Sequence, residues 1–186
     1  MFQARPGDGL DRILMFILDI EGNSGGNFSC AVAIARHFII GHFPDLPGQK
    51  TNYDRKTDSY ALYSIASPNH LGIGEITAPV VVLQNHTTTS VAEHFLDFMS
   101  YAQNAVSVGT ESAGGTGDPA SAVLPGGGSI RLSNNKITHG DGTPFLNIGI
   151  QPDIYVENTI QDYINGRNKI FERGLAELMR MCNQAE

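Results

Sequence analysis

The residue types that could do chemistry are concentrated in the stretch Thr89-Ser90-Val91-Ala92-Glu93. The β-branched, apolar run at 79–85 precedes it and predicts a short buried strand. After it, apolar residues recur at helical spacing from Val91 to Met99. Ser90 is therefore predicted at the N-terminus of a helix, where unpaired backbone N–H groups and the helix dipole can stabilise an alkoxide or an oxyanion. The stretch indicates a serine nucleophile at a strand-to-helix junction.

The same residues also have a purely structural interpretation. Ser90-x-x-Glu93 fits a capping box, in which the serine caps the helix and the glutamate reaches back to the serine N–H. Considered alone, the stretch fits capping better than catalysis. Other parts of the chain have to decide between the two.

A pair of glycines follows the first apolar run of the chain. Residues 13–18 are continuously apolar, which predicts a central strand in a sheet covered on both faces. The run leads through Asp19 and Glu21 to Gly25 and Gly26. Turns at the carboxyl ends of such strands bind ligands, and adjacent glycines can present their N–H groups to a substrate oxygen. The alternative is a plain loop at the start of a helix.

The remaining elements predict a mixed α/β architecture. Strands alternate with helices over the first 110 residues, which favours a parallel-rich sheet, and the next 45 residues have the turn signals of hairpins. The expected strands are 60–65, 105–109 and an edge strand within 148–156; the expected helices are 27–38, 90–103, 159–164 and 167–182; the expected loops are 45–56 and 112–119, the second of them glycine-rich and mobile.

Composition and motif spacing exclude several classes of function. The 186 residues carry a net charge of −7, so nucleic acid is not an expected partner. Membrane insertion is not expected, because no apolar run reaches the roughly 18 residues that a membrane span needs. The six histidines form no metal-binding spacing, and Gly114-Gly115-Thr116-Gly117 lacks the lysine of a phosphate loop. We therefore expect neither a metal nor a cofactor.

Taken together, these stretches resemble the C-terminal processing peptidases, also called tail-specific proteases. Each motif is short, but they occur in the family's order and at similar spacing between about residue 13 and residue 180. The matching segments are Phe16 to Gly26 with its Asp-x-x-Gly-Asn-x-Gly-Gly pattern, Pro79 to Glu93 with Thr-x-Ser-x-x-Glu, Val108 to Gly115, Leu124-Pro125-Gly126-Gly127 and Gly149-Ile150-Gln151-Pro152-Asp153.

The resemblance implies a fold of the crotonase and caseinolytic-protease type, with a mixed sheet and flanking helices. It implies Ser90 as the nucleophile, and an oxyanion hole formed by the N–H of Val91 and that of Gly25 or Gly26. The substrate would be a polypeptide entered from its C-terminal end, in a periplasmic or other extracytoplasmic compartment. These roles agree with the chemistry, because a tetrahedral oxyanion needs preorganised donors and a serine needs a base.

The chain departs from the family pattern in the residues that would complete the site. Members with a lysine base carry it in the glycine-rich loop, where this chain has Gly115. The tricorn-like branch uses an upstream histidine, and a glutamate before the Gly-Ile-x-Pro-Asp motif, where this chain has Phe145-Leu146-Asn147. We therefore expect residues 1–186 to form a single domain, the C-terminal part of a serine-peptidase domain without its upstream region. The general base would come from outside this chain.

Three hypotheses about function follow. The first is the nucleophile-bearing half of a serine peptidase that forms an acyl-enzyme on Ser90. The second is a non-catalytic module that binds a peptide or a lipophile on the same fold, as the missing acid and base would allow. The third is a different crotonase-like enzyme. Covalent labelling of Ser90 by a serine-directed phosphonate separates the first from the second.

Overall fold

The structure is a computed structural model that describes residues 15–54, 56–65, 68–133, 135–139 and 141–184. Its helices are α1 (Phe28–Ala35), α2 (Val91–Met99), α3 (Ile160–Ile164) and α4 (Lys169–Gln184). Its strands are β1 (Phe16–Asp19), β2 (His42–Pro44), β3 (Gly48–Asp54), β4 (Ser59–Ile65), β5 (Asn69–Leu71), β6 (Val80–Gln84), β7 (Ala105–Gly109), β8 (Pro119–Val123), β9 (Ser129–Ser133), β10 (Asn135–Ile137) and β11 (Ile154–Tyr155).

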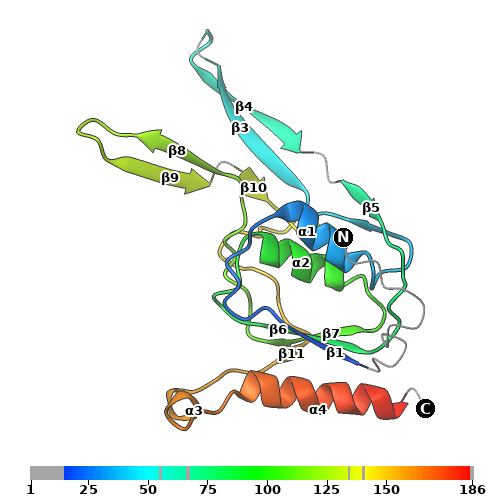
Figure 1. Cartoon of the computed structure of the whole chain (residues 1–186). Coiled ribbons are helices and arrows are strands. Elements are labelled where there is room, and N and C mark those ends of the chain that lie inside the picture. Colours follow the sequence, from blue (N-terminus) through cyan, green and yellow to red (C-terminus); the bar gives the residue numbers. More distant parts are fainter. Residues whose placement is uncertain (1–14, 55, 66–67, 134, 140, 185–186) are drawn as a thin grey trace.

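A four-stranded sheet forms the body of the molecule. Its order is β1-β6-β7-β11, and every neighbouring pair is parallel. Helices α1 and α2 cover one face of this sheet and α4 covers the other (Figure 1). The mixed α/β prediction is confirmed, and so are the parallel-rich sheet and the edge position of the strand within 148–156.

Strand β6 explains why its sequence is apolar throughout. It pairs with β1 on one side and with β7 on the other, and all five of its residues are buried. Val80 and Val82 pack with α1 and α2, whereas Val81 and Leu83 pack with α4. A parallel strand covered on both faces has no solvent-facing side, so its sequence shows no alternation.

Two predictions from the sequence are wrong. The apolar run before Asp19 was expected in a central strand, but β1 lies at the edge of the described sheet and its residues are only half-buried or exposed. Residues 45–56 were expected to form a loop, but β3 lies there and pairs with β4 over seven residue positions. The first prediction failed because an apolar sequence indicates burial but does not indicate the order of strands in a sheet. The second failed because the backbone hydrogen bonds of a hairpin do not require an apolar sequence.

Two hairpins extend away from the body on the side of α1 and α2 (Figure 1). One is β3–β4, which β10 extends, and the other is β8–β9, as the turn signals predict. Their exposed apolar residues include Leu62, Val123 and Leu132. The small β2–β5 pair lies beside the helices. None of the helices in the described ranges is long and apolar enough to cross a membrane.

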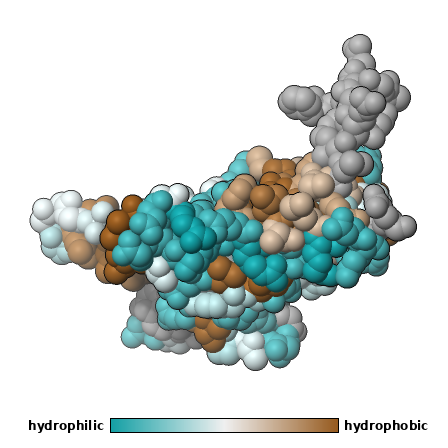
Figure 2. Space-filling view, turned by 90° about the horizontal axis from the view of Figure 1, so that it is seen from below, coloured by the Kyte–Doolittle hydropathy of each residue, from teal (hydrophilic) through white to brown (hydrophobic). Residues whose placement is uncertain are grey.

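Helix α4 approaches the sheet closely at Gly174. A Cβ atom at this position would lie 2.5 Å from Leu83 Cδ2 and 3.2 Å from Val81 Cγ1. Ile170 and Leu178 pack on the same face of the sheet, one turn before and one turn after the glycine. The outer face of α4 leaves Phe171, Leu175 and Met179 exposed. Figure 2, which views the molecule from the α4 side, shows hydrophobic residues exposed among hydrophilic ones.

Replacing Gly174 with leucine should lower the free energy of unfolding by about 1–3 kcal/mol, because the new side chain overpacks the contact with β6. Chemical denaturation of Gly174→Leu measures this change. Ala176→Leu, on the exposed side of the same helix, is the matched control and should change stability by about 0.5 kcal/mol or less. Equal effects of the two substitutions would contradict the close packing of α4.

Candidate active site

The turn between β6 and α2 is held by hydrogen bonds to the loop that follows β1. Thr88 Oγ1 accepts from Asn85 N–H at 3.1 Å and donates to the Ile20 carbonyl at 2.9 Å. Thr89 N–H donates to the Asn23 carbonyl at 3.0 Å. These bonds join two turns at the carboxyl ends of adjacent parallel strands, where sheets of this class bind ligands.

Ser90 occupies the predicted junction in an unusual backbone conformation. It is the N-cap of α2, with φ 61° and ψ −130°. A positive φ is unfavourable for a residue with a side chain and is stabilised only by its surroundings. A serine nucleophile on a sharp strand-to-helix turn has this kind of strained geometry, which pushes its hydroxyl out of the turn. Ser90 is half-buried and lines a cavity of about 660 Å³.

The structure brings the glycine turn against Ser90, as the sequence predicts. A Cβ atom on Gly25 would lie 2.7 Å from Val91 N and 3.0 Å from Ser90 Oγ, and Gly25 has φ +88°. Glycine is therefore required by the contact and by the backbone. Both Gly25 and Gly26 line the same cavity as Ser90.

The structure distinguishes the three proposed oxyanion donors. Gly25 N–H already donates to Asn23 Oδ1 at 2.9 Å. Among the described residues, neither Val91 N–H nor Gly26 N–H has a hydrogen-bond acceptor. Val91 is the first residue of α2, where an unpaired N–H is expected. Of these three N–H groups, those of Val91 and Gly26 are thus without an acceptor in the described part of the chain.

Glu93 joins the serine turn to the glycine-rich loop. Its side chain is fully buried. Oε2 accepts from Ser90 N–H at 2.9 Å and from Gly115 N–H at 3.1 Å. Oε1 accepts from Ser112 Oγ at 2.7 Å and from Gly114 N–H at 2.6 Å. A buried carboxylate is tolerated only when it is hydrogen-bonded in this way.

The capping interpretation is therefore only partly realised. Ser90 and Glu93 have the arrangement of a capping box, and the glutamate half is a hydrogen bond. The Ser90 hydroxyl makes no capping hydrogen bond to the helix, so it stays available at the cavity. The glycine-rich loop is anchored through Ser112, whose Oγ also accepts from Ile150 N–H at 2.8 Å. These contacts are at odds with the expectation that the first half of this loop is mobile.

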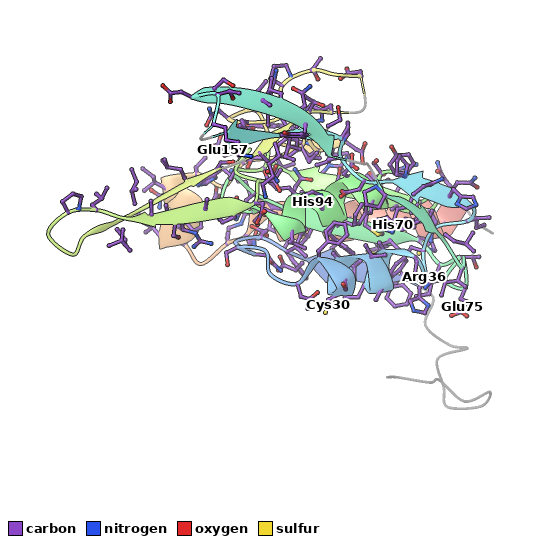
Figure 3. All side chains as sticks on the ribbon, turned by 90° about the horizontal axis from the view of Figure 1, so that it is seen from above. Cys30, Arg36, His70, Glu75, His94 and Glu157 are labelled. Carbon is purple, nitrogen blue, oxygen red and sulfur yellow. The ribbon has the colours of Figure 1, made fainter. Side chains whose placement is uncertain are left out.

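A histidine–carboxylate pair that the sequence did not predict lies in the same cavity. His94 Nδ1 is 2.6 Å from Asp45 Oδ1, and their side chains are only 14% and 11% exposed. Ser90, His94 and Asp45 all line the 660 Å³ cavity. Figure 3 shows His94 on α2 beside His70. The i, i+4 spacing of Ser90 and His94 was the available signal, but nothing in the sequence connects Asp45 to this helix.

Asp97 lies close to this pair and has an altered acidity. The pKa of the Asp97 carboxyl is raised to about 7, mainly by burial and also by repulsion from the Asp45 carboxylate, while His94 acts in the opposite direction. The carboxyl is therefore protonated in the folded chain below neutral pH. No group of three or more histidine, cysteine or acidic residues within the described ranges could hold a metal ion.

Most of the sequence matches the model of a known family. A sequence model of peptidase family S41 matches residues 9–156. The chain belongs to peptidase family S41. A carboxy-terminal-processing protease from Bartonella bacilliformis is 26% identical over 159 residues, which cover 84% of this chain and 34% of that protein.

Solved structures agree with this assignment. A structure from Parabacteroides merdae, described as a candidate peptidase, superimposes with a TM-score of 0.73 at 25% identity and covers 89% of this chain and 52% of that one. The photosystem II D1 C-terminal processing protease superimposes with a TM-score of 0.56 at 21% identity, and the match covers 79% of this chain and 36% of that one. It shows that the two folds are alike. This S41 chain thus spans only a third to a half of the proteins that it matches here.

Replacing Glu93 with glutamine should destabilise the chain by about 1–3 kcal/mol, because the amide NH₂ cannot accept and leaves at least one buried N–H unpaired. Thermal and chemical denaturation measure the loss. Glu157→Gln removes an exposed carboxylate and serves as the control, with an expected change of about 0.5 kcal/mol or less. If Glu93→Gln were as stable as the control, the four hydrogen bonds could not be the anchor of the loop.

Asp97→Asn should change how stability depends on pH. The folded chain keeps the Asp97 proton up to about pH 7, whereas the unfolded chain releases it near its ordinary pKa of 3.8. Stability therefore decreases as the pH rises from about 4 to about 7, and the asparagine variant lacks this decrease. Denaturation at a series of pH values measures it, with Glu157→Gln as the control that keeps the decrease. Parallel curves for the wild type and Asp97→Asn would refute the assignment.

Proposed function

We propose that this chain carries the nucleophile-bearing part of a serine peptidase, which hydrolyses polypeptides through an acyl-enzyme on Ser90. The observation that carries the proposal is the packing of Gly25 against Ser90 Oγ and Val91 N. This contact lies beside a serine with a strained backbone, and the N–H groups of Val91 and Gly26, the neighbours of Ser90 and Gly25 in sequence, have no acceptor among the described residues. Membership of peptidase family S41 supports the same activity.

The geometry supports a particular division of roles. Ser90 Oγ attacks the carbonyl carbon of a peptide bond, and the N–H groups of Val91 and Gly26 stabilise the oxyanion that forms. Gly25 permits the close approach of the turn, and its own N–H holds the turn in shape through Asn23. Glu93 keeps the serine turn and the glycine-rich loop together without facing the substrate.

The finer features of the family are part of the same proposal. A parallel sheet with helices on both faces fits the crotonase and caseinolytic-protease type of fold. The name of the Bartonella bacilliformis relative suggests cleavage near the carboxyl terminus of a polypeptide. None of the comparisons supports the alternative of a non-catalytic peptide- or lipophile-binding module.

A fluorophosphonate probe tests the proposal, because it reacts with activated serine hydroxyls. We expect labelling at Ser90, located by mass spectrometry of tryptic peptides, and no labelling of Ser90→Ala. Ser129→Ala, in the exposed β8–β9 hairpin, is the matched control and should be labelled as the wild type is. Hydrolysis of an unfolded protein such as casein, in this chain and in a longer one, should show the same dependence on Ser90.

The binding-module alternative gives a different result in both assays. In that case neither the chain nor a longer protein would be labelled or would cleave casein. If labelling persisted in Ser90→Ala, the reactive serine would lie elsewhere, and Ser90 would be only the N-cap of α2.

A further inference from the structure

The proposed nucleophile needs a proton acceptor, and the cavity beside it contains few candidates. Among the residues that the structure describes, the ionisable side chains that line it are Asp45, His94, Asp118 and Arg131. An arginine stays protonated and cannot act as a base. Asp118 is exposed and pairs with Lys50 at 3.3 Å. His94 contributes an imidazole to this lining, a group that can accept a proton in its neutral form and donate it once protonated.

The position of His94 on α2 suits this task. Ser90 is the N-cap of α2 and His94 lies in the helix four residues later, and both residues line the same cavity. Side chains of an α-helix lean toward its N-terminus, which is the end of α2 where Ser90 lies. Within the described chain the two side chains form no hydrogen bond, and such bonds often tighten only when substrate fills the site.

The surroundings of His94 fix its ring and its tautomer. Asp45 Oδ1 lies 2.6 Å from Nδ1, so the carboxylate holds the hydrogen on Nδ1 and leaves the Nε2 lone pair free to accept. Phe28 packs edge-on to the imidazole with ring centroids 5.5 Å apart, and Phe98 lies at 6.4 Å. A carboxylate on one ring nitrogen and a free second nitrogen are the arrangement of a general base.

We propose that His94, oriented by Asp45, is the general base for Ser90, so that the base lies within this chain. The inference rests on the proposed function of Ser90 and replaces the expectation of a base from outside. As Ser90 Oγ bonds to the substrate carbonyl carbon, its proton passes to His94 Nε2. The C–N bond then breaks, and His94 gives this proton to the leaving amine.

The second half of the reaction restores the site. Water attacks the acyl carbon and gives a proton to His94 Nε2. The bond between Ser90 Oγ and the carbonyl carbon then breaks, and His94 returns the proton to Ser90 Oγ. The products are a carboxylic acid and an amine, and no other reactant is needed.

A structural interpretation of the pair has to be separated from this one. A histidine–carboxylate contact could simply tie α2 to the segment after β2. The chain offers a comparison in His37 and Glu75, which pair at 3.0 Å with side chains 42% and 64% exposed. Glu75 lies apart from His94, toward the other end of the helices (Figure 3). If the His94–Asp45 contact were purely structural, substitutions in the two pairs should have similar effects on the rate at which a serine-directed probe labels Ser90.

The test measures the rate of fluorophosphonate labelling of Ser90 in this chain. His94→Ala should lower the rate about 10²- to 10⁴-fold, and added imidazole should restore part of it by entering the space left by the ring. Asp45→Asn should also slow labelling, but without rescue by imidazole. His37→Ala should label at the wild-type rate.

His94→Gln guards against a loss of folding. Glutamine can still donate to Asp45 but cannot accept and release a proton as imidazole does. A His94→Gln variant that keeps the wild-type melting temperature and loses labelling rate as His94→Ala does supports the proposal. A His94→Gln variant that labels at the wild-type rate overturns it, and so does a slow His94→Ala variant that imidazole does not rescue.

The outcomes distinguish this inference from the proposed function. If Ser90 is labelled at an undiminished rate in His94→Ala, the base lies elsewhere and the serine peptidase proposal stands. If wild-type chain is not labelled, the internal base is refuted, whereas Ser90-dependent casein hydrolysis by a longer chain would preserve the function. If labelling persists in Ser90→Ala, the function itself fails.

Discussion

The buried carboxylate of Glu93 is the interaction on which the rest of the site depends. A charge without exposure to water needs donors, and Glu93 has four, from Ser90, Ser112, Gly114 and Gly115. It also lies in the first turn of α2, where the helix dipole favours a negative charge. Because its donors belong to two separate segments, the carboxylate fixes the glycine-rich loop relative to the serine turn. It also occupies the Ser90 N–H, so that the next N–H along the chain, that of Val91, is the one left for a ligand.

The strained backbone at Ser90 follows from the same set of contacts. A positive φ at a residue with a side chain costs on the order of 1–3 kcal/mol and persists only where its surroundings determine it. Here the Ser90 N–H donates to Glu93 and the Thr89 N–H donates to the Asn23 carbonyl. Gly25 has no side chain, so it can pack against Ser90 where any Cβ atom would clash. The conformation therefore depends on the pairing of β1 with β6, which brings the two turns together. Local sequence alone would not keep the serine in this conformation.

The features that could be predicted from the sequence are those that short-range residue patterns encode. The apolar run of β6, the helical spacing after Ser90 and the glycines at 25 and 26 were enough to predict the strand, the helix and the turn, whereas the meeting of the two turns was implied by the family resemblance. Strand β3 was missed because its sequence is polar, whereas its pairing with β4 is made by backbone groups that the hydrophobic pattern does not report. The edge position of β1 depends on which strands pair, which hydrophobicity does not report. His94 and Asp45 are 49 residues apart, so only the fold brings them together. The preference for Gly26 over Gly25 as the proposed oxyanion donor depends on one hydrogen bond, which the Gly25 N–H donates to the Asn23 side chain.

The glycine at position 115 bears on which residue acts as the general base. In the lysine-dependent peptidases that the chain resembles, this position of the loop carries the base. Here a Cβ atom would lie 2.6 Å from Thr89 Oγ1, so a side chain would press on the residue that precedes the proposed nucleophile. The tight packing of the loop against the serine turn thus favours a base from another direction, and α2 supplies one through His94. Nucleophile, oxyanion donor and base would then share one helix end. The orienting carboxylate would not, because Asp45 N–H donates to the Pro68 carbonyl at 3.0 Å, next to the β2–β5 pair. Alignment of the proposed base would consequently depend on how β2 and β5 pack beside α2, whereas the proposed oxyanion site would depend on the sheet and its two turns.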